Sequence, residues 1–381
     1  MKLPSYEQQL SALVATPSVS SAHPDLDTSN RPVLDILATW FQDLGFSVVY
    51  LPVPGEPDKA NLLATLGQGD SGLVLSGHTD TVPFNAERWQ QDPFKLTTRD
   101  ERWYGLGATD MKGFFPVITE AVKGIKAEQL KQPIMVLATA DEETSMSGAR
   151  ALAEIGQPKG RYAIIGEPTN LQPIRAHKGI MMESVRIQGL AGHSSNPKLG
   201  KNAMEAMHEV LAELLLFRKQ MEAKYENASF AIKTPTLNLG YIHGGDNPNR
   251  ICGHCELHFD LRPLPGMSLE DLRAEISQRL QPISEKFNTP LTFESLFPGV
   301  PAFEQPQNSA LVQAAHELTG QTPESVAFAT EAPFLQGLGM ETLVMGPGSI
   351  DQAHQPNEYI AMSQIDPAVA VLKGLIKKFC M

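Results

Sequence analysis

The sequence predicts an α/β fold, in which a mixed, largely parallel sheet is flanked by helices and an α+β module is inserted into the chain. The first observation is a set of short, largely apolar runs, which are typical of strands buried on both faces of a parallel sheet. These runs are 73–75 (LVL), 134–140 (IMVLATA), 162–166 (YAIIG) and 341–346 (ETLVMG). Helical periodicity between the runs is the second observation. The third is a change after residue 178 to strands in which apolar and polar residues alternate.

Two domains are expected, because a chain of 381 residues exceeds the size at which a single hydrophobic core stops growing. Alternating strands and amphipathic helices over 178–290 indicate an antiparallel sheet with helices on one face. The stretches 1–177 and 291–381 carry the α/β pattern. We therefore expect these two stretches to form one domain and 178–290 to form the inserted one.

Composition and charge disfavour several classes of protein. Hydrophobic residues make up 42% of the chain and charged residues 19%, which is ordinary for a globular enzyme and argues against disorder. The net charge of −12 disfavours nucleic acid and anionic membrane as partners. No apolar run approaches the roughly 20 residues that span a bilayer, and the N-terminus lacks the apolar core of a signal peptide. Three cysteines make no disulfide framework, so we expect a cytoplasmic protein.

The first domain begins with two helical patterns, at 5–16 and 30–45. In the second pattern, Pro32 lies in a first turn that tolerates proline, and Gly45 is a suitable C-cap. Strands are then predicted at 46–53 and 61–66. Further on, Asp110 precedes a helical run at 111–125, so a purely structural role as a helix N-cap is open for it.

The inserted module is predicted to contain three alternating strands and two helices. The strands are expected at 182–188, 236–242 and 251–262, and the first helix at 201–225. Ser268 and Asp271 form a capping pattern that begins the second helix. The chain then returns to the α/β pattern, with a helix at 307–319, the strand at 341–346 and a final helix at 364–379.

Polar side chains follow each buried run, at the point where the strand ends. In chain order they are His78 and Asp80, then Glu142 and Glu143, then Glu167, and finally His354 in the last loop. Because open α/β sheets place their ligands at the carboxyl ends of strands, we expect these side chains to converge, with Asp110 beside them. So many carboxylates would repel each other, and a pair of divalent cations removes that repulsion. Imidazole and carboxylate ligands suit zinc, with cobalt or manganese as alternatives, and Asp110 is the candidate bridge.

The adjacent acids Glu142 and Glu143 can have separate roles. On extended backbone their side chains point in opposite directions, so one can ligate a metal while the other faces a metal-activated water. A carboxylate beside such a water is the general base that a hydrolase needs. If extended backbone also continues to Asp80, the side chains of His78 and Asp80 point to the same side.

Five segments together resemble the M20 family of di-zinc amidohydrolases and aminoacylases: GHTDTVP, YGLGATDMKG, ATADEETSMSGA, IIGEPT and AHQPNEY. The resemblance covers nearly the whole chain and implies a zinc-peptidase-like catalytic domain. It implies two metal sites, one of His78, Asp110 and Glu167 and one of Asp110, Glu143 and His354. It also implies that Glu142 accepts the proton and that Asp80 orients His78.

By the same resemblance, the inserted module corresponds to the family's lid and dimerisation domain, which implies a homodimer. His193, in AGHSS, resembles the lid histidine that stabilises the tetrahedral oxyanion, usually from the partner subunit. A solvated loop histidine is the alternative. Asn249, Arg250 and Arg262 are candidates to hold a substrate α-carboxylate, since arginine offers bidentate geometry, although Arg262 could equally form a surface ion pair.

Segments outside the metal motifs bear on the substrate, which is expected to be a small N-acyl amino acid. RAHKG, GHSSNP, TLNLGYIHGGDNPNRIC, DLRPLPGM, TEAPF and GPGSIDQAHQPNEY resemble the family members that remove the acetyl group from N²-acetyl-L-ornithine in arginine biosynthesis. The alternatives are a succinyl-diaminopimelate desuccinylase, an aminoacylase, a dipeptidase, or a metal-binding scaffold without turnover. An intact Glu142 argues against the scaffold, which needs the ligands but not the base.

The segment Cys252-Gly253-His254-Cys255 looks like a zinc or redox motif. In a strand, however, residues three apart face opposite sides, so the two thiols would not share an ion or a bond. Cys255 lies in register with Leu257 and Phe259, as a core residue would. We therefore expect no metal there.

Overall fold

The computed structural model describes residues 3–381 and divides into two compact units. The first unit contains the chain up to Arg175, together with Gln305–Glu324 and Thr330–Met381. The second unit contains Ala176–Glu304 and Ser325–Ala329. No helix within residues 3–381 combines the length and the apolar composition needed to cross a membrane.

The first unit is built on a mixed sheet. Its strands are β1 (Ser47–Val53), β2 (Glu56–Leu66), β3 (Leu73–His78), β6 (Ile134–Thr139), β7 (Tyr162–Pro168), β15 (Glu341–Gly346) and β8 (Ile174–His177). In space they follow the order β1-β2-β6-β3-β7-β15-β8. β8 spans the division between the units at Ala176, and it pairs with β13 (Phe303–Glu304), which belongs to the second unit, and with β14 (Glu324–Val326). The four neighbouring strands β6, β3, β7 and β15 run parallel, and antiparallel pairing is confined to the two sides. The predicted mixed sheet with a parallel centre is confirmed.

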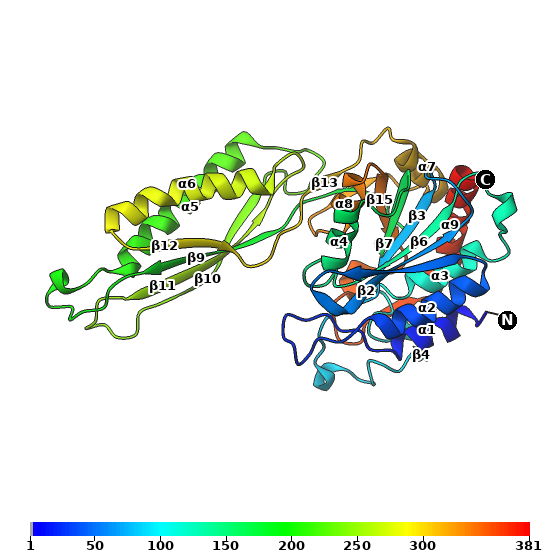
Figure 1. Cartoon of the computed structure of the whole chain (residues 1–381), viewed down its shortest axis with the longest axis horizontal. Helices are drawn as coiled ribbons and strands as arrows, with labels where there is room; N and C mark the ends of the chain where they lie inside the picture. Colours follow the sequence, from blue (N-terminus) through cyan, green and yellow to red (C-terminus); the bar gives the residue numbers. More distant parts are fainter. Residues whose placement is uncertain (1–2) are drawn as a thin grey trace. The chain divides into compact units, whose positions relative to one another are not determined.

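Helices cover both faces of this sheet (Figure 1). They are α1 (Tyr6–Val14), α2 (Arg31–Asp43), α3 (Phe114–Val122), α4 (Ser147–Ile155), α7 (Ala310–Thr319), α8 (Ala332–Gly337) and α9 (Ile365–Cys380). On one face α3 and α9 pack on β3, with α1, α2 and α7 around them, and on the other α4 and α8 pack on the sheet and on each other. A small third sheet joins β4 (Thr97–Arg99), β5 (Arg102–Tyr104) and β16 (Tyr359–Ala361).

Local signals define the ends of several helices as the sequence predicts. Pro32 lies in the first turn of α2, and Gly45 follows its end at φ +88°, a conformation that glycine adopts without strain. The amide of Phe46 then donates to the carbonyl of Phe41, which closes the helix. In the second unit, the Ser268 hydroxyl accepts the amide of Asp271 at 3.2 Å and caps α6 (Leu269–Phe287).

The second unit is an antiparallel sheet with two helices on one face (Figure 1). Its strands are β9 (Met181–Gln188), β10 (Thr236–Gly244), β11 (His254–Arg262) and β12 (Leu291–Ser295), in the spatial order β10-β11-β9-β12, and its helices are α5 (Ala203–Lys224) and α6. β12 pairs with β9, and Phe303 and Glu304 pair with His177 and Ala176, so this unit runs to Glu304, whereas the sequence-based division placed its end at 290.

The strand with the cysteines begins later than the pattern predicts. β11 starts at His254, so Cys252 lies outside it and strand alternation does not describe the pair. Cys255 is buried in the core of the second unit, as expected, and Cys252 is buried as well. Both are free thiols, and Sγ of Cys252 donates to the carbonyl of His254.

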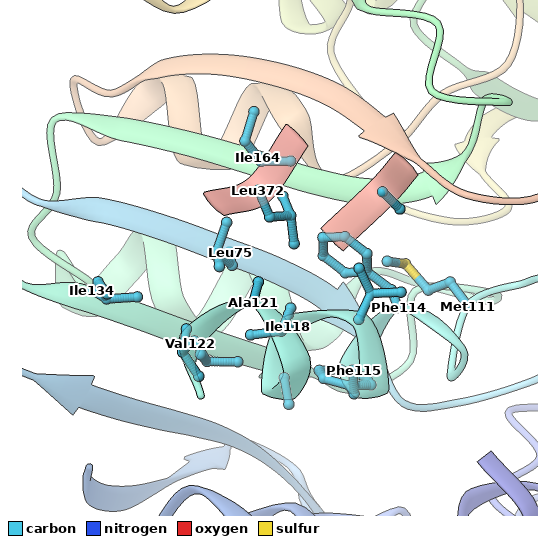
Figure 2. Close-up of a cluster of buried hydrophobic side chains, with 14 of the residues drawn as sticks. Leu75, Met111, Phe114, Phe115, Ile118, Ala121, Val122, Ile134, Ile164 and Leu372 are labelled. Carbon is cyan, nitrogen blue, oxygen red and sulfur yellow. The ribbon is translucent and has the colours of Figure 1, made fainter. Parts of the chain in front are cut away.

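α3 anchors the core of the first unit and leads the chain away from Asp110. Nearly every side chain of this helix is buried, which is typical of a helix enclosed on all sides. Figure 2 shows Phe114, Phe115 and Ile118 among the side chains of Leu75 from β3 and Ile164 from β7. The ring of Phe114 lies against Gly166, where an added Cβ would come within 2.1 Å of it.

Gly166→Ala should therefore destabilise the protein by about 1–3 kcal/mol, since overpacking a filled core forces side chains or backbone to shift. Urea denaturation measures the change in the free energy of unfolding. Gly337→Ala in α8 is the matched control, because no heavy atom lies within 4 Å of the added carbon, and it should change stability by less than about 0.5 kcal/mol. Equal stability of the two variants would show that Phe114 moves aside without cost.

Candidate metal centre

Five side chains lie together at the carboxyl edge of the four parallel strands. His78 ends β3, Glu167 lies near the end of β7, Glu143 follows β6, His354 follows β15, and Asp110 precedes α3. The strands are neighbours in the order β6-β3-β7-β15, so their carboxyl ends present these residues to one place.

Asp110 lies between the two histidines. Its Oδ1 is 3.0 Å from Nε2 of His78, and its Oδ2 is 3.5 Å from Nε2 of His354. Nε2 of His354 is also 2.9 Å from Oε2 of Glu143, and Nε2 of His78 is 4.0 Å from Oε1 of Glu167. Ligand atoms of His78, Asp110 and Glu143 all lie within 4.8 Å of one another, close enough for one cation to reach them. The two oxygens of Asp110 therefore face two different sets of donors.

Burial and charge shift the protonation of these groups in opposite directions. Burial, with the charge of Glu167, raises the pKa of Glu142 well above its usual range, and burial with the charge of Asp110 does the same for Glu167. Burial alone would also raise the pKa of Asp110, but its hydrogen bonds with His354 and His78 outweigh burial and lower it. Hydrogen bonds with Asp110 and Glu143 raise the pKa of His354 to about 10.

Several buried carboxylate oxygens at this edge accept no hydrogen bond within residues 3–381 and could therefore coordinate a cation. Oε1 of Glu143, Oε1 of Glu167 and Oδ1 of Asp80 are without a hydrogen-bond partner within residues 3–381. Leaving a buried carboxylate oxygen unpaired is costly, and a bound cation offsets that cost. Carboxylate oxygens combined with two imidazoles form a donor set that fits zinc and similar divalent ions.

Asp80 contacts both sides of this cluster from a fully buried position. Nδ1 of His78 lies 3.0 Å from the backbone oxygen of Asp80 and 3.7 Å from its Oδ1. Oδ2 of Asp80 accepts the backbone N–H of Glu143 at 3.1 Å. β3 ends at His78, so the backbone is not extended as far as Asp80, but the two side chains still meet.

Glu142 and Glu143 do not lie on extended backbone, and the argument from strand alternation is wrong for them. β6 ends at Thr139, and residues 142–145 form a turn. Asp141 has φ +55°, and its carbonyl accepts the amides of Ser145 and Met146. The turn, rather than a strand, sets the directions of the two acids.

Asp110 is not a helix N-cap, which was the structural alternative for it. α3 begins at Phe114, and Gly113 occupies the N-cap position. Asp110 belongs instead to the turn before the helix, whose amides are bound by the carboxylate of Glu358. The side chain of Asp110 is thereby left for the two histidines.

Sequence reasoning did not single out Glu331 and Glu358, two buried glutamates beside the site. Glu331 is 1% exposed, accepts the hydroxyl of Thr139 at 2.9 Å, and has its pKa raised by burial to about 7. Burial raises the pKa of Glu358 to about 8. Both belong to segments that carry the family resemblance, TEAPF and AHQPNEY, but neither follows a strand, which was the signal that located the other acids.

A buried ion pair, also not singled out, holds the turn that carries Glu142. Nζ of Lys59, whose side chain is 3% exposed, lies 2.9 Å from Oδ1 of Asp141 and 2.9 Å from Oδ1 of Asp27. The hydroxyl of Ser20 donates to the same oxygen of Asp141. The turn is thus fastened to β2 and to the segment that follows α1.

His193, Asn249 and Arg250 lie together in the second unit. His193 forms a β-bridge with Arg250, and the amide of Ser194 donates to the carbonyl of Asn249. The side chains of His193 and Arg250 are exposed, and Arg250 pairs with Asp246 at 2.6 Å. One loop surface of the second unit therefore carries all three predicted residues.

Arg262 lies apart from this loop, at the end of β11. Its Nε is 2.9 Å from Oδ2 of Asp260, so the ion pair considered for it is formed. Arg262 also lines a cavity of about 440 Å³ in the second unit, together with Lys178 and Phe230.

Comparison with known proteins identifies the family. The sequence profile of the Peptidase family M20/M25/M40 matches residues 74–378. The chain belongs to this family. Acetylornithine deacetylases of Pectobacterium carotovorum and Pectobacterium atrosepticum are 51% and 50% identical to it over 380 residues, covering 100% of this chain and 99% of each relative. The family membership predicted from the five segments is confirmed, and the chain is a hydrolase of the M20 type.

Solved structures show the same fold. A metallo-carboxypeptidase of the M20 family from Sulfolobus solfataricus matches with a TM-score of 0.77 at 17% identity, over 98% of this chain and 99% of that one. A Bacillus subtilis protein, described as a dinuclear metal-binding peptidase of the M20 family, matches with a TM-score of 0.68 at 14% identity, over 97% and 96% of the two chains.

Adding Zn²⁺ or Co²⁺ to chelator-treated protein should raise its Tm, because a ligand that binds only the folded state stabilises that state. At a ligand concentration a hundredfold above Kd, the free energy of unfolding should increase by about 2.7 kcal/mol. The gain should increase from about pH 6 to about pH 8. A histidine must lose its proton to bind a metal, and the raised pKa of His354 means that this proton has to be displaced throughout the range. A higher pH makes the displacement less costly.

Differential scanning calorimetry at several pH values measures this gain, and excess chelator should reverse it. His354→Ala should reduce the gain, since this variant loses a donor that contacts both Asp110 and Glu143. An equal gain in the variant would place the stabilising ion elsewhere.

Proposed function

We propose that this chain removes the acetyl group from N²-acetyl-L-ornithine, giving L-ornithine and acetate. The assignment of the substrate rests on the 51% identity, over the full length, to a protein named acetylornithine deacetylase. The cluster of His78, Asp110, Glu143, Glu167 and His354 supports metal-dependent hydrolysis, because these donors converge and the charges of Glu167 and His78 act on the acid Glu142. The buried, free cysteines fit a reducing, cytoplasmic setting.

Two divalent ions, zinc or cobalt, are proposed to bind here. His78, Asp110 and Glu167 would hold one ion, and Asp110, Glu143 and His354 the other. The position of Asp110 supports the role of shared ligand, since its two oxygens face different histidines. When bound, the ions would polarise the amide carbonyl and make the attacking water more acidic.

Glu142 is proposed to move the proton. It takes one proton from the water as the oxygen attacks the carbonyl carbon, and the amide C–N bond then breaks. Glu142 delivers the proton to the leaving nitrogen, so that the products are acetate and the free amino group of ornithine. Burial, with the charge of Glu167, raises the pKa of Glu142, which favours keeping the proton on this carboxyl group between the two steps.

The second unit is proposed to complete the site in a homodimer. His193 would stabilise the tetrahedral oxyanion, and Asn249, Arg250 or Arg262 would hold the α-carboxylate of the substrate. The exposed imidazole of His193 beside Arg250 supports a role in contacting a ligand from outside the second unit. Asp80 would keep His78 oriented through the contacts at its Nδ1.

The substrate assignment predicts a clear order of activities. With Zn²⁺ or Co²⁺ restored, kcat/KM for N²-acetyl-L-ornithine should exceed that for N-succinyl-diaminopimelate and for N-acetylmethionine by at least about 10-fold, the discrimination that a few specific contacts supply. Release of ornithine by the metal-free protein is the control and should be near background. A preference for either competitor would overturn the substrate and keep the chemistry, and metal binding without hydrolysis would favour a scaffold.

Glu142→Ala should lower kcat by about 10²–10⁴-fold, the usual contribution of a general base, while metal binding is largely kept. Steady-state kinetics and metal analysis of the same sample measure the two effects. Glu154→Ala, at an exposed position of the following helix α4, is the control and should change neither. Turnover near the wild-type rate in Glu142→Ala would exclude the proposed role.

A further inference from the structure

Glu358 is a buried carboxylate that binds the backbone of another segment. Glu358 is only 2% exposed to solvent. Oε1 accepts the amides of Thr109 and Asp110, at 2.7 and 2.9 Å, and Oε2 accepts the amide of Gly107 at 3.0 Å. Three amides thus converge on one carboxylate, and one of them belongs to the residue that lies between the two histidines.

Further contacts fasten the same two segments side by side. The amide of Gly105 donates to the carbonyl of Glu358 at 3.0 Å, and the hydroxyl of Thr109 donates to the carbonyl of Tyr359 at 2.5 Å. Tyr359 pairs with Tyr104 where β16 adds to β5. The chain that carries Asp110 and the chain that carries His354 are therefore joined just beside both residues.

We propose that Glu358 is a positioning residue for the metal centre, which aligns the carboxylate of Asp110 with His78 and His354 by fixing the backbone of the Asp110 turn. This inference rests on the proposed function, because it assumes that Asp110 and His354 bind metal. Glu358 lies four residues after His354, so one short segment supplies a donor and also holds the turn of the shared donor. Groups that orient ligands in this way typically change metal affinity by about 10–100-fold when they are altered.

The contact needs two acceptor oxygens on a side chain of this length, because three amides converge on them. A glutamine has a single acceptor oxygen, so its NH₂ group would face either the Gly107 amide or the pair from Thr109 and Asp110. A donor placed against a donor leaves a buried N–H unpaired and displaces the turn. An aspartate keeps the charge but is one methylene shorter, so it cannot reach all three amides without moving the backbone.

Metal affinity separates positioning from a general contribution to stability. Zn²⁺ would be titrated, in competition with a chromophoric chelator, into metal-free wild-type protein and into Glu358→Gln and Glu358→Asp. Glu341→Gln is the matched control, because this glutamate of the same unit also accepts a backbone amide, that of Leu311 at 3.0 Å. Glu341 lies at the amino end of β15, whereas the predicted ligands lie at the carboxyl ends of the parallel strands. The Tm of each metal-free protein would be measured in parallel.

Glu358→Gln should weaken Zn²⁺ binding by about 10-fold or more, and Glu358→Asp by about 3-fold or more. Glu341→Gln should weaken Zn²⁺ binding by less than about 2-fold, although it lowers the Tm of the metal-free protein by an amount similar to that in the Glu358 variants. If Glu358→Gln does not fold, the aspartate variant decides. Wild-type affinity in a folded Glu358 variant, or an equal loss in Glu341→Gln, overturns the inference. Zn²⁺ affinity is measured without substrate, so a wrong substrate leaves this test intact. A wild-type protein that binds no Zn²⁺ overturns the proposed metal centre and this inference together.

Discussion

Repulsion between buried carboxylates is the constraint on which the candidate site depends. Two like charges 4 Å apart repel by about 4 kcal/mol at the effective dielectric of a protein surface, and more inside the protein. At the carboxyl edge of the central sheet, His78 and His354 offer imidazoles to the acids around them. The pKa of Glu142, Glu143 and Glu167 is raised as a result, mainly by burial and by neighbouring carboxylates. Divalent cations relieve this repulsion, which is why the geometry suits a metal centre.

Two buried acids around the site are held in place by protein groups rather than by a metal ion. Glu358 is held by three backbone amides, and Asp141 is held by the amine of Lys59 and the hydroxyl of Ser20. Each arrangement joins segments that are far apart in the chain. The acids nearest the histidines are placed by this outer layer, since it fixes the turns before α3 and after β6.

Patterns that depend on burial alone were predicted well from the sequence. Continuous apolar runs identified β3, β6, β7 and β15, because strands covered on both faces have no polar side. Features that depend on distant hydrogen bonds were not predicted. The turn at 142–145 is held through the carboxylate of Asp141 by Lys59 and Ser20, and β12 belongs to the second unit because it pairs with β9. No local pattern encodes either partner.

The sequence by itself determined the family, the class of fold and the set of acids and histidines at the strand ends, because these follow from local composition and from motif order. Only the tertiary structure decided which atoms meet: that Asp110 faces two histidines, that Glu358 binds the Asp110 amide, and that the buried Glu331 binds Thr139. The reason is physical. Glu358 lies 248 residues from the Asp110 amide that it binds, and a contact at that separation is selected by packing of the whole unit, not by neighbouring residues.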